Sequence, residues 1–330
     1  MNIHNSLIFA NLLPDIISKF PQNNALSYVD EVPMTYAQMG NNIEAVQALI
    51  EECEIQVGDK VAIYSQNMPN WAVVYFALQC MGVVAVPILP DFNSFELQNV
   101  LEHSEAKAIF ISSNLAFKLK EVKTNFINWA VRIDDFEILQ GKNKIAVYQE
   151  NAKPNKTYLP NEEDLSILLY TSGTTGNSKG VMLSQKNVIS NAFQAQCVQE
   201  ILDSDRFLSV LPLSHTYENT IGLILPILKG ASITYLKKPP VASVLLPALK
   251  VVKPTLMLTV PLIIEKVYKA SILPTIQKKT LTRLMYKYSI TRKLIHRLAG
   301  KKLYQTFGGN LKFFGIGGAK LDPQVEQFLR

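Results

Sequence analysis

Short apolar runs of strand length alternate with helix-like segments along most of the chain. The runs are rich in valine, isoleucine and leucine, as expected for strands buried in a sheet. The predicted strands are 60–64, 83–88, 108–111, 130–133, 165–170, 207–211, 232–236 and 255–260. Helical segments separate most of them, for example residues 94–103. This alternation predicts an α/β fold, in which a mostly parallel sheet carries helices on both faces.

Residues 71–90 form an uncharged, mostly apolar stretch that is long enough to span a bilayer. However, Asn70 precedes a helix-like run, Gly82 ends that run, and residues 83–87 have the composition of a buried strand. A helix–glycine–strand unit inside an α/β core therefore explains this stretch better than a membrane span.

Composition sets few further limits. The 330 residues are 48% hydrophobic and 18% charged, which is ordinary for a globular protein and is enough for one large domain or two smaller ones. A polar connector at residues 149–156 is a candidate boundary. A net charge of +6 is weak support for nucleic-acid or membrane binding. The cysteines (Cys53, Cys80 and Cys197) lack metal-ligand spacing, which indicates free thiols in a reducing compartment. The sequence also starts without a signal-peptide pattern, so a cytoplasmic protein is predicted.

A loop of glycines, hydroxyl residues and one lysine follows the strand 165–170. Ser184, after the loop, is a candidate N-cap for a helix that runs to about Glu200. Glycines let the backbone approach a ligand closely, while the hydroxyls and the lysine suit a polyphosphate. The predicted phosphate-binding residues are Thr171, Ser172, Gly173, Thr174, Thr175, Gly176 and Lys179. The alternative is a polar surface loop without a ligand.

This loop differs from the nucleotide-hydrolase P-loop. Counting from Gly173, serine occupies position 178, where that motif has glycine, and Gly180 follows the lysine in place of Ser or Thr. The run Tyr-Thr-Ser-Gly-Thr-Thr-Gly-x-x-Lys-Gly instead closely resembles the signature of the adenylate-forming superfamily, which includes acyl-CoA synthetases, peptide-synthetase adenylation domains and luciferases. Ser178 replaces the proline that is usual before the lysine, so the loop loses one restraint on its backbone.

The resemblance implies a fold and a reaction. The fold would be the large N-terminal domain of an acyl-CoA synthetase, with two packed, mostly parallel sheets. The connector at residues 149–156 would lie within this one domain and would not be a domain break. The reaction would join a carboxylic acid to AMP, release pyrophosphate and pass the acyl group to coenzyme A. The loop would hold the β- and γ-phosphates of ATP, and Thr175 would contact Mg²⁺.

Residues 211–218, Leu-Pro-Leu-Ser-His-Thr-Tyr-Glu, follow another predicted strand and precede a helix-like run at 219–228. Ligands of open α/β sheets bind at the carboxyl ends of strands. Leu-Pro-Leu-x-His-x-x-Glu resembles a core motif of long-chain fatty acyl-CoA synthetases. That resemblance assigns His215, Tyr217 and Glu218 to the acyl-binding side. Without it, His215 would be more typical of a structural loop histidine.

A strand that runs into a glycine turn is predicted at residues 311–321. It resembles the family's Gly-Gly-Ala-Pro-Leu element, with Lys320 in place of proline. The resemblance places Gly317, Gly318 and Ala319 beside the adenine and acyl groups, whereas the alternative is a simple tight turn.

Residues 266–302 are strongly cationic, with apolar residues interleaved roughly at helical spacing. A basic amphipathic helix of this kind can lie on an anionic membrane, although a solvated helix on the large domain fits equally well. Nucleic acid is not expected, because base-stacking and groove-binding motifs are missing.

Asp322 and Pro323 begin a predicted helix. The resemblance to the family covers nearly the whole chain, but only the first part of a family member's length. Residues 1–330 are therefore expected to be an incomplete AMP-binding domain without the small C-terminal domain, and an inactive fragment. The substrate expected is a long-chain fatty acid. An aryl, amino or short-chain acid is the enzymatic alternative, and a non-catalytic nucleotide- or lipid-binding protein is the other.

Overall fold

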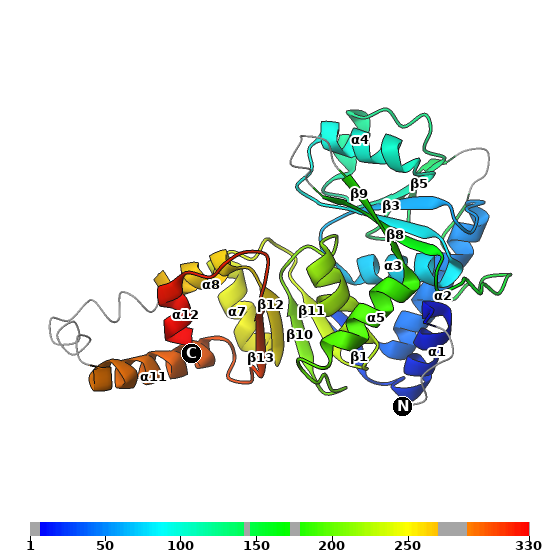
Figure 1. Ribbon diagram of the computed structural model, residues 1–330. Coiled ribbons are helices and arrows are strands. Elements are labelled where there is room, and N and C mark those ends of the chain that lie inside the picture. Colours follow the sequence, from blue (N-terminus) through cyan, green and yellow to red (C-terminus); the bar gives the residue numbers. More distant parts are fainter. Residues whose placement is uncertain (1–6, 142–145, 172–178, 270–288, 330) are drawn as a thin grey trace.

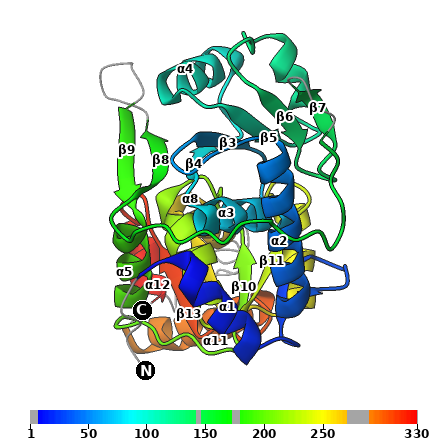
Figure 2. The ribbon, with the colours of Figure 1, turned by 90° about the vertical axis from the view of Figure 1, so that its right-hand side faces the viewer.

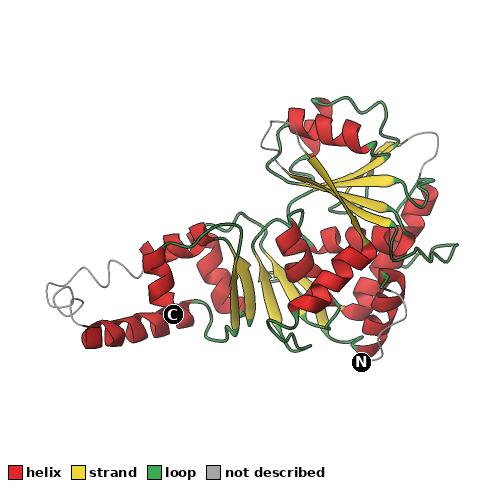
Figure 3. Cartoon of the chain, viewed as in Figure 1, coloured by secondary structure: helices red, strands yellow, loops and turns green. Residues whose placement is uncertain are grey.

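Two sheets organise the chain in the computed structural model, which describes residues 7–141, 146–171, 179–269 and 289–329. One sheet has six strands in the order β13-β12-β10-β11-β1-β2, and the other has seven in the order β7-β6-β5-β3-β4-β8-β9 (Figure 3). The six strands are β1 (Asn24–Tyr28), β2 (Met34–Thr35), β10 (Arg206–Ser209), β11 (Ser232–Tyr235), β12 (Leu256–Thr259) and β13 (Phe313–Ile316). The seven are β3 (Lys60–Tyr64), β4 (Val84–Ile88), β5 (Ala108–Ile111), β6 (Trp129–Arg132), β7 (Ile138–Gly141), β8 (Leu165–Thr171) and β9 (Lys179–Ser184).

Most neighbouring strands run parallel. The exceptions are the pairs β1–β2, β6–β7 and β8–β9, which are antiparallel and lie at sheet edges. All eight strands predicted from apolar runs are present, each within two residues of its expected bounds. The predicted α/β class and the two mostly parallel sheets are confirmed.

Helices pack on both sheets (Figures 1 and 2). They are α1 (Phe9–Lys19), α2 (Tyr36–Glu52), α3 (Pro69–Met81), α4 (Ser94–Ser104), α5 (Gln185–Ala195), α6 (Leu225–Ile227), α7 (Ala242–Val252), α8 (Pro261–Val267), α11 (Ser289–Thr306) and α12 (Pro323–Leu329). A short 3₁₀ helix, η1, spans Ala116–Lys120, and a π-helical segment, η2, spans Glu218–Ile224.

The apolar stretch at residues 71–90 is buried within the protein. α3 starts with Pro69, ends at Gly82 in a left-handed conformation with φ 70°, and leads into β4. Every residue of α3 from Trp71 onward is buried, because the helix contacts β1 of one sheet and β3 and β4 of the other. None of the described helices combines the length and apolarity that a membrane crossing would require.

Two predicted helix starts are confirmed by their caps. The Ser184 hydroxyl accepts a hydrogen bond from the Asn187 N–H at 3.2 Å, and Asp322 Oδ1 accepts one from the Gln324 N–H at 2.8 Å. The helix after Ser184 is shorter than expected, since α5 ends at Ala195 instead of near Glu200.

Candidate functional site

The predicted phosphate loop lies in a β-hairpin. β8 and β9 are antiparallel neighbours, and Thr171 faces Lys179 across the pair. The expectation that the loop leads directly into a helix is therefore wrong, because the six residues of β9 come first. Ser172, Gly173, Thr174, Thr175 and Gly176 lie outside the described residues. Thr171 and Lys179 are both exposed, so the lysine ammonium is accessible to a soluble anion.

Buried hydrogen bonds fix the base of this hairpin. Gln79 on α3 donates to the Ser166 carbonyl on β8 at 3.0 Å, and the Ser166 hydroxyl bonds to the Gln79 side-chain oxygen. Gln185, the first residue of α5, donates to the Gln79 carbonyl at 2.9 Å. At the other end of β8, the Tyr170 hydroxyl and His103 Nδ1 lie 2.7 Å apart. Hydrogen bonds near both ends of β8 thus attach the hairpin to the rest of the fold.

The segment 211–218 is tied to both sheets by Asn67, which lies in the loop after β3. The Asn67 amide donates to the Ser209 hydroxyl at 3.0 Å and to the Leu211 carbonyl at 2.6 Å. Its oxygen accepts from the Leu213 N–H at 2.9 Å. Because β3 and β10 belong to different sheets, Asn67 fixes this segment at their junction. This role could not be predicted from the sequence, because nothing in it indicates which groups a loop asparagine will bond to.

Glu218 lies in the interior, at the start of η2, and only 1% of its surface is exposed. The Ser209 hydroxyl donates to Glu218 Oε1 at 2.6 Å, whereas Oε2 has no partner among the described residues. The carboxyl packs on Gly222, where a Cβ would lie 2.7 Å from Glu218 Cδ. Burial raises the pKa of this carboxyl to about 8, despite the hydrogen bond from Ser209, which lowers it. Glu218 is therefore largely protonated at neutral pH.

Tyr217 and Gly317 are brought together, although a hundred positions separate them in the sequence. A Cβ on Gly317 would lie 2.9 Å from Tyr217 Cε1, and one on Gly315 would lie 2.6 Å from the Tyr217 hydroxyl oxygen. Only glycine leaves room for the tyrosine ring against β13. Gly318 has φ +83°, a left-handed conformation that turns the chain after this strand. Gly318 and Ala319 are exposed.

An apolar cavity of about 170 Å³ lies behind Tyr217. Its walls come from the end of α5, from η2 and from three strands, and they include Val198, Ile221, Leu225 and Phe313. His215 is exposed, and its Nδ1 accepts a hydrogen bond from the Tyr217 N–H at 3.3 Å. The structure thus groups His215, Tyr217 and Gly317 beside an apolar space, while the Glu218 carboxyl faces Ser209 in the core.

Comparison with known proteins adds family information to this geometry. The family profile described as "AMP-binding enzyme" matches residues 14–330. Long chain acyl-CoA synthetase 6, peroxisomal, of Arabidopsis thaliana is 26% identical over 322 residues, which cover 90% of this chain and 46% of that protein. Fatty acyl-CoA synthetase A of Dictyostelium discoideum is 24% identical, with 90% and 48% covered. This chain spans about half the length of these relatives.

Solved structures share the fold. ATP-bound MatB from Rhodopseudomonas palustris has a TM-score of 0.74 at 20% identity, with 97% of this chain and 57% of that chain covered. The N-terminal domain of FACL13 from Mycobacterium tuberculosis has a TM-score of 0.73 at 17% identity, with 97% and 72% covered.

Proposed function

Because this chain belongs to the AMP-binding enzyme family, we propose that it carries the acid- and ATP-binding part of a long-chain fatty acid–CoA ligase. In the proposed reaction, a carboxylate oxygen of the fatty acid attacks the α-phosphorus of ATP. Pyrophosphate leaves with the electrons of the broken P–O bond, and an acyl-adenylate remains. The thiol of coenzyme A then attacks the acyl carbon, and AMP departs.

The observation that carries this proposal is the contact of Tyr217 with Gly315 and Gly317, beside an apolar cavity. The cavity offers an acyl chain a surface without charge, and the exposed backbone at Gly318 and Ala319 offers hydrogen-bonding groups to an adenylate. The similarity to long-chain and fatty acyl-CoA synthetases of Arabidopsis and Dictyostelium supports the fatty-acid assignment.

The phosphate-binding role is proposed for residues 171–179, with Lys179 as the cation that holds departing pyrophosphate. Thr175, the predicted contact of Mg²⁺, lies outside the described residues. Among the residues the structure does describe, no group of three or more His, Cys, Asp or Glu side chains could hold a metal ion. We propose that Mg²⁺ arrives on the ATP phosphates, where it neutralises negative charge.

A shorter or smaller acid is the second candidate substrate. The cavity volume of about 170 Å³ is below the roughly 300 Å³ at which ligand pockets usually begin. A long chain would require Ile221 and Leu225 to move, whereas a short chain fits the cavity as it stands.

Non-hydrolysable acyl-adenylate analogues test this function directly. We expect isothermal titration to show that palmitoyl and dodecanoyl analogues bind more tightly than the acetyl analogue, and that Ile221→Trp, which fills the cavity, removes that preference. A matched substitution outside the cavity, Val57→Trp on the exposed surface, should leave it intact. Tighter binding of the acetyl analogue would assign a short acid, and failure of every analogue to bind would refute the adenylate site.

We further propose that residues 1–330 alone do not turn over. The chain matches only 46% of the Arabidopsis synthetase, so the catalytic groups that a family member supplies from its remaining length are outside it. Release of AMP by the purified chain with ATP, coenzyme A and any acid from acetate to stearate would contradict this.

Replacing Lys179 with alanine is expected to weaken ATP binding about tenfold, because an exposed cation at a phosphate site contributes on the order of 1 to 2 kcal/mol. Lys186→Ala provides a control, since Lys186 is a half-buried lysine of α5 that is paired with Glu162 and Glu163. Titration with Mg²⁺–ATP measures both affinities. An unchanged affinity in the Lys179 variant would remove this lysine from the site.

Peripheral membrane contact through residues 266–302 is also proposed, within a cytoplasmic protein. Part of this region lies outside the described residues, but α11 carries three exposed cations, Arg297, Lys301 and Lys302, within six positions. We expect cosedimentation with anionic vesicles at 20 mM salt, and most of it should be lost at 500 mM, because screening weakens charge attraction. Equal sedimentation with neutral vesicles would contradict the electrostatic basis.

A further inference from the structure

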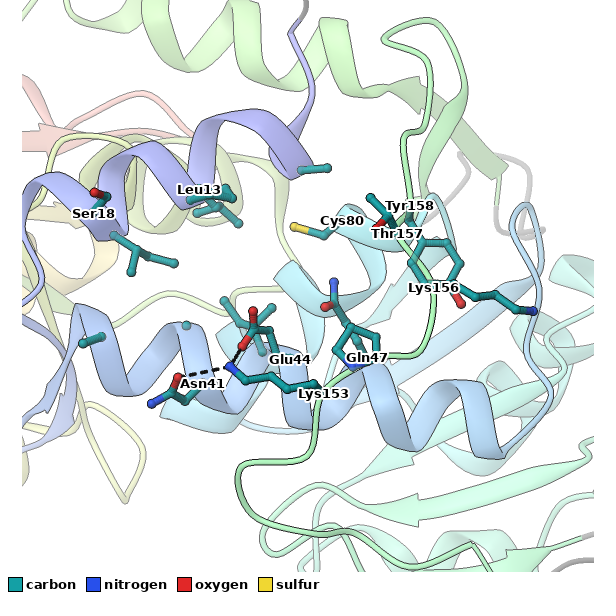
Figure 4. Close-up of a pocket in the computed structure, with 17 residues that line it drawn as sticks. Leu13, Ser18, Asn41, Glu44, Gln47, Cys80, Lys153, Lys156, Thr157 and Tyr158 are labelled. Atoms are coloured by element: carbon teal, nitrogen blue, oxygen red, sulfur yellow. Dashed lines mark hydrogen bonds and ion pairs between the residues drawn. The ribbon is translucent and has the colours of Figure 1, made fainter.

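A second cavity, of about 510 Å³, lies between α1, α2 and the connector residues 153–158 (Figure 4). This volume is within the range of roughly 300 to 1,000 Å³ that is typical of small-molecule pockets. It shares no lining residue with the apolar cavity beside Tyr217. The two cavities are therefore separate features of the fold.

The cavity follows one face of each of the two helices. Ala37, Gly40 and Glu44 contribute from α2, at the spacing of three to four residues that defines a helix face. Leu13 and Ile17 contribute from α1. Gly40 keeps the space open, since a Cβ there would lie 3.1 Å from Ile17 Cδ1.

The outer wall is held in place by specific hydrogen bonds. Glu51, near the end of α2, accepts bonds from the Asn155 N–H at 2.7 Å, the Lys156 N–H at 3.1 Å and the Tyr158 hydroxyl at 2.8 Å. Lys153 pairs with Glu44 across the cavity. These contacts hold the connector in place, so the cavity is formed before a ligand binds.

One polar side chain in the cavity has no protein partner. Gln47 is only 7% exposed, and its amide makes no hydrogen bond with any residue that the structure describes. Figure 4 shows this side chain directed from α2 toward Cys80. The amide nitrogen and oxygen still reach solvent, so a ligand that hydrogen-bonds to them replaces water.

The charges around the cavity favour a neutral ligand. Lys153 is neutralised by Glu44, and Figure 4 shows the Lys156 ammonium turned away from the other labelled residues. Burial raises the pKa of the Cys80 thiol to about 12, so this wall carries no charge at neutral pH. A buried carboxylate or ammonium would therefore lack a counter-ion here.

We propose that this cavity binds a neutral, single-chain aliphatic molecule with one hydrogen-bonding head group, whose head pairs with Gln47 and whose chain lies between α1 and α2. A primary amide matches the Gln47 side chain, since each can donate to and accept from the other. The chain contacts Leu13, Ile17 and Ile43. This inference does not depend on the proposed ligase function, whose substrate is an anion bound elsewhere.

Methyl NMR of isoleucine-labelled protein, titrated with octanamide, separates the two cavities. Ile17 and Ile43 line the proposed site, and Ile221 lines the cavity beside Tyr217. We expect the signals of Ile17 and Ile43 to shift with octanamide while Ile221 does not. Octanoate should bind this site at least tenfold more weakly.

Gln47→Leu keeps the side-chain volume and removes the amide, and we expect it to weaken octanamide binding at least fivefold. Gln149→Leu, the same substitution at an exposed position outside the cavity lining, should leave the affinity unchanged. Gly40→Val, which fills the groove against Ile17, is a second variant and should abolish the shifts.

The proposal would be overturned if octanamide left Ile17 and Ile43 unshifted, if Gln47→Leu bound it as tightly as the parent chain, or if octanoate bound equally well. Shifts confined to Ile221 would mean that octanamide occupies only the cavity beside Tyr217. Because neither result depends on acyl-adenylate binding, this test and that of the proposed function fail separately.

Discussion

Replacing Glu218 with glutamine is expected to remove most of the fall in the free energy of unfolding that this chain shows as the pH rises from 4.5 to about 8. The unfolded chain releases the Glu218 proton near the ordinary pKa of 4.5, whereas burial holds the folded-state pKa at about 8. Between these values unfolding releases one proton, so the free energy of unfolding falls as pH rises, by about 1.4 kcal/mol per unit. The contribution is complete below pH 4.5 and is lost above about 8.

Urea unfolding at pH 5, 6, 7 and 8 measures this slope in both proteins. Glutamine keeps an oxygen that can accept from Ser209, so the variant should fold and show a flatter profile. Glu102→Gln, on an exposed part of α4, is the control and should retain the parent slope. Equal slopes in the parent chain and in Glu218→Gln would show that Glu218 does not keep its proton in the fold.

Asn67→Ala is expected to lower the free energy of unfolding by about 3 kcal/mol and to weaken binding of a dodecanoyl-adenylate analogue at least tenfold. The substitution removes the hydrogen bonds to Ser209, Leu211 and Leu213, each worth about 1 kcal/mol. Loss of these bonds also frees the segment that positions Tyr217, which explains the predicted loss of affinity.

Asn70→Ala is the matched control. Its amide donates to the carbonyls of Ile133 and Asp134, at 2.8 and 2.9 Å, and these lie away from the segment 211–218. We expect this variant to lose stability but to keep its affinity for the analogue. Chemical unfolding and calorimetric titration measure the two quantities separately. Similar affinity losses in both variants would indicate a general stability effect and would refute a positioning role for Asn67.

The regular elements of this fold could be predicted because the sequence encodes them locally. Apolar residues identify buried strands such as β3 and β5, and the serine at 184 and the aspartate at 322 mark helix starts through bonds to N–H groups two or three positions away. The alternation of strands and helices was sufficient to predict the α/β class.

β9 illustrates the limit of local reasoning. Its residues Lys179–Ser184 are mostly exposed and begin with a lysine and a glycine, so they carry no buried-strand pattern. They form a strand because β8 offers an unpaired edge on which their backbone can form hydrogen bonds. A partner elsewhere in the chain therefore decides the conformation.

The candidate site likewise combines residues that were predicted from the sequence with contacts that were not. The sequence alone predicted the candidate residues, namely the glycine- and hydroxyl-rich loop, the motif at 211–218 and the glycines at 317 and 318. Only the tertiary structure decided that Tyr217 packs on Gly317, that Glu218 turns inward to Ser209 and that Asn67 joins the sheets. These contacts connect positions 9 to 146 residues apart. Such contacts depend on how the strands and helices pack, which local propensity does not encode.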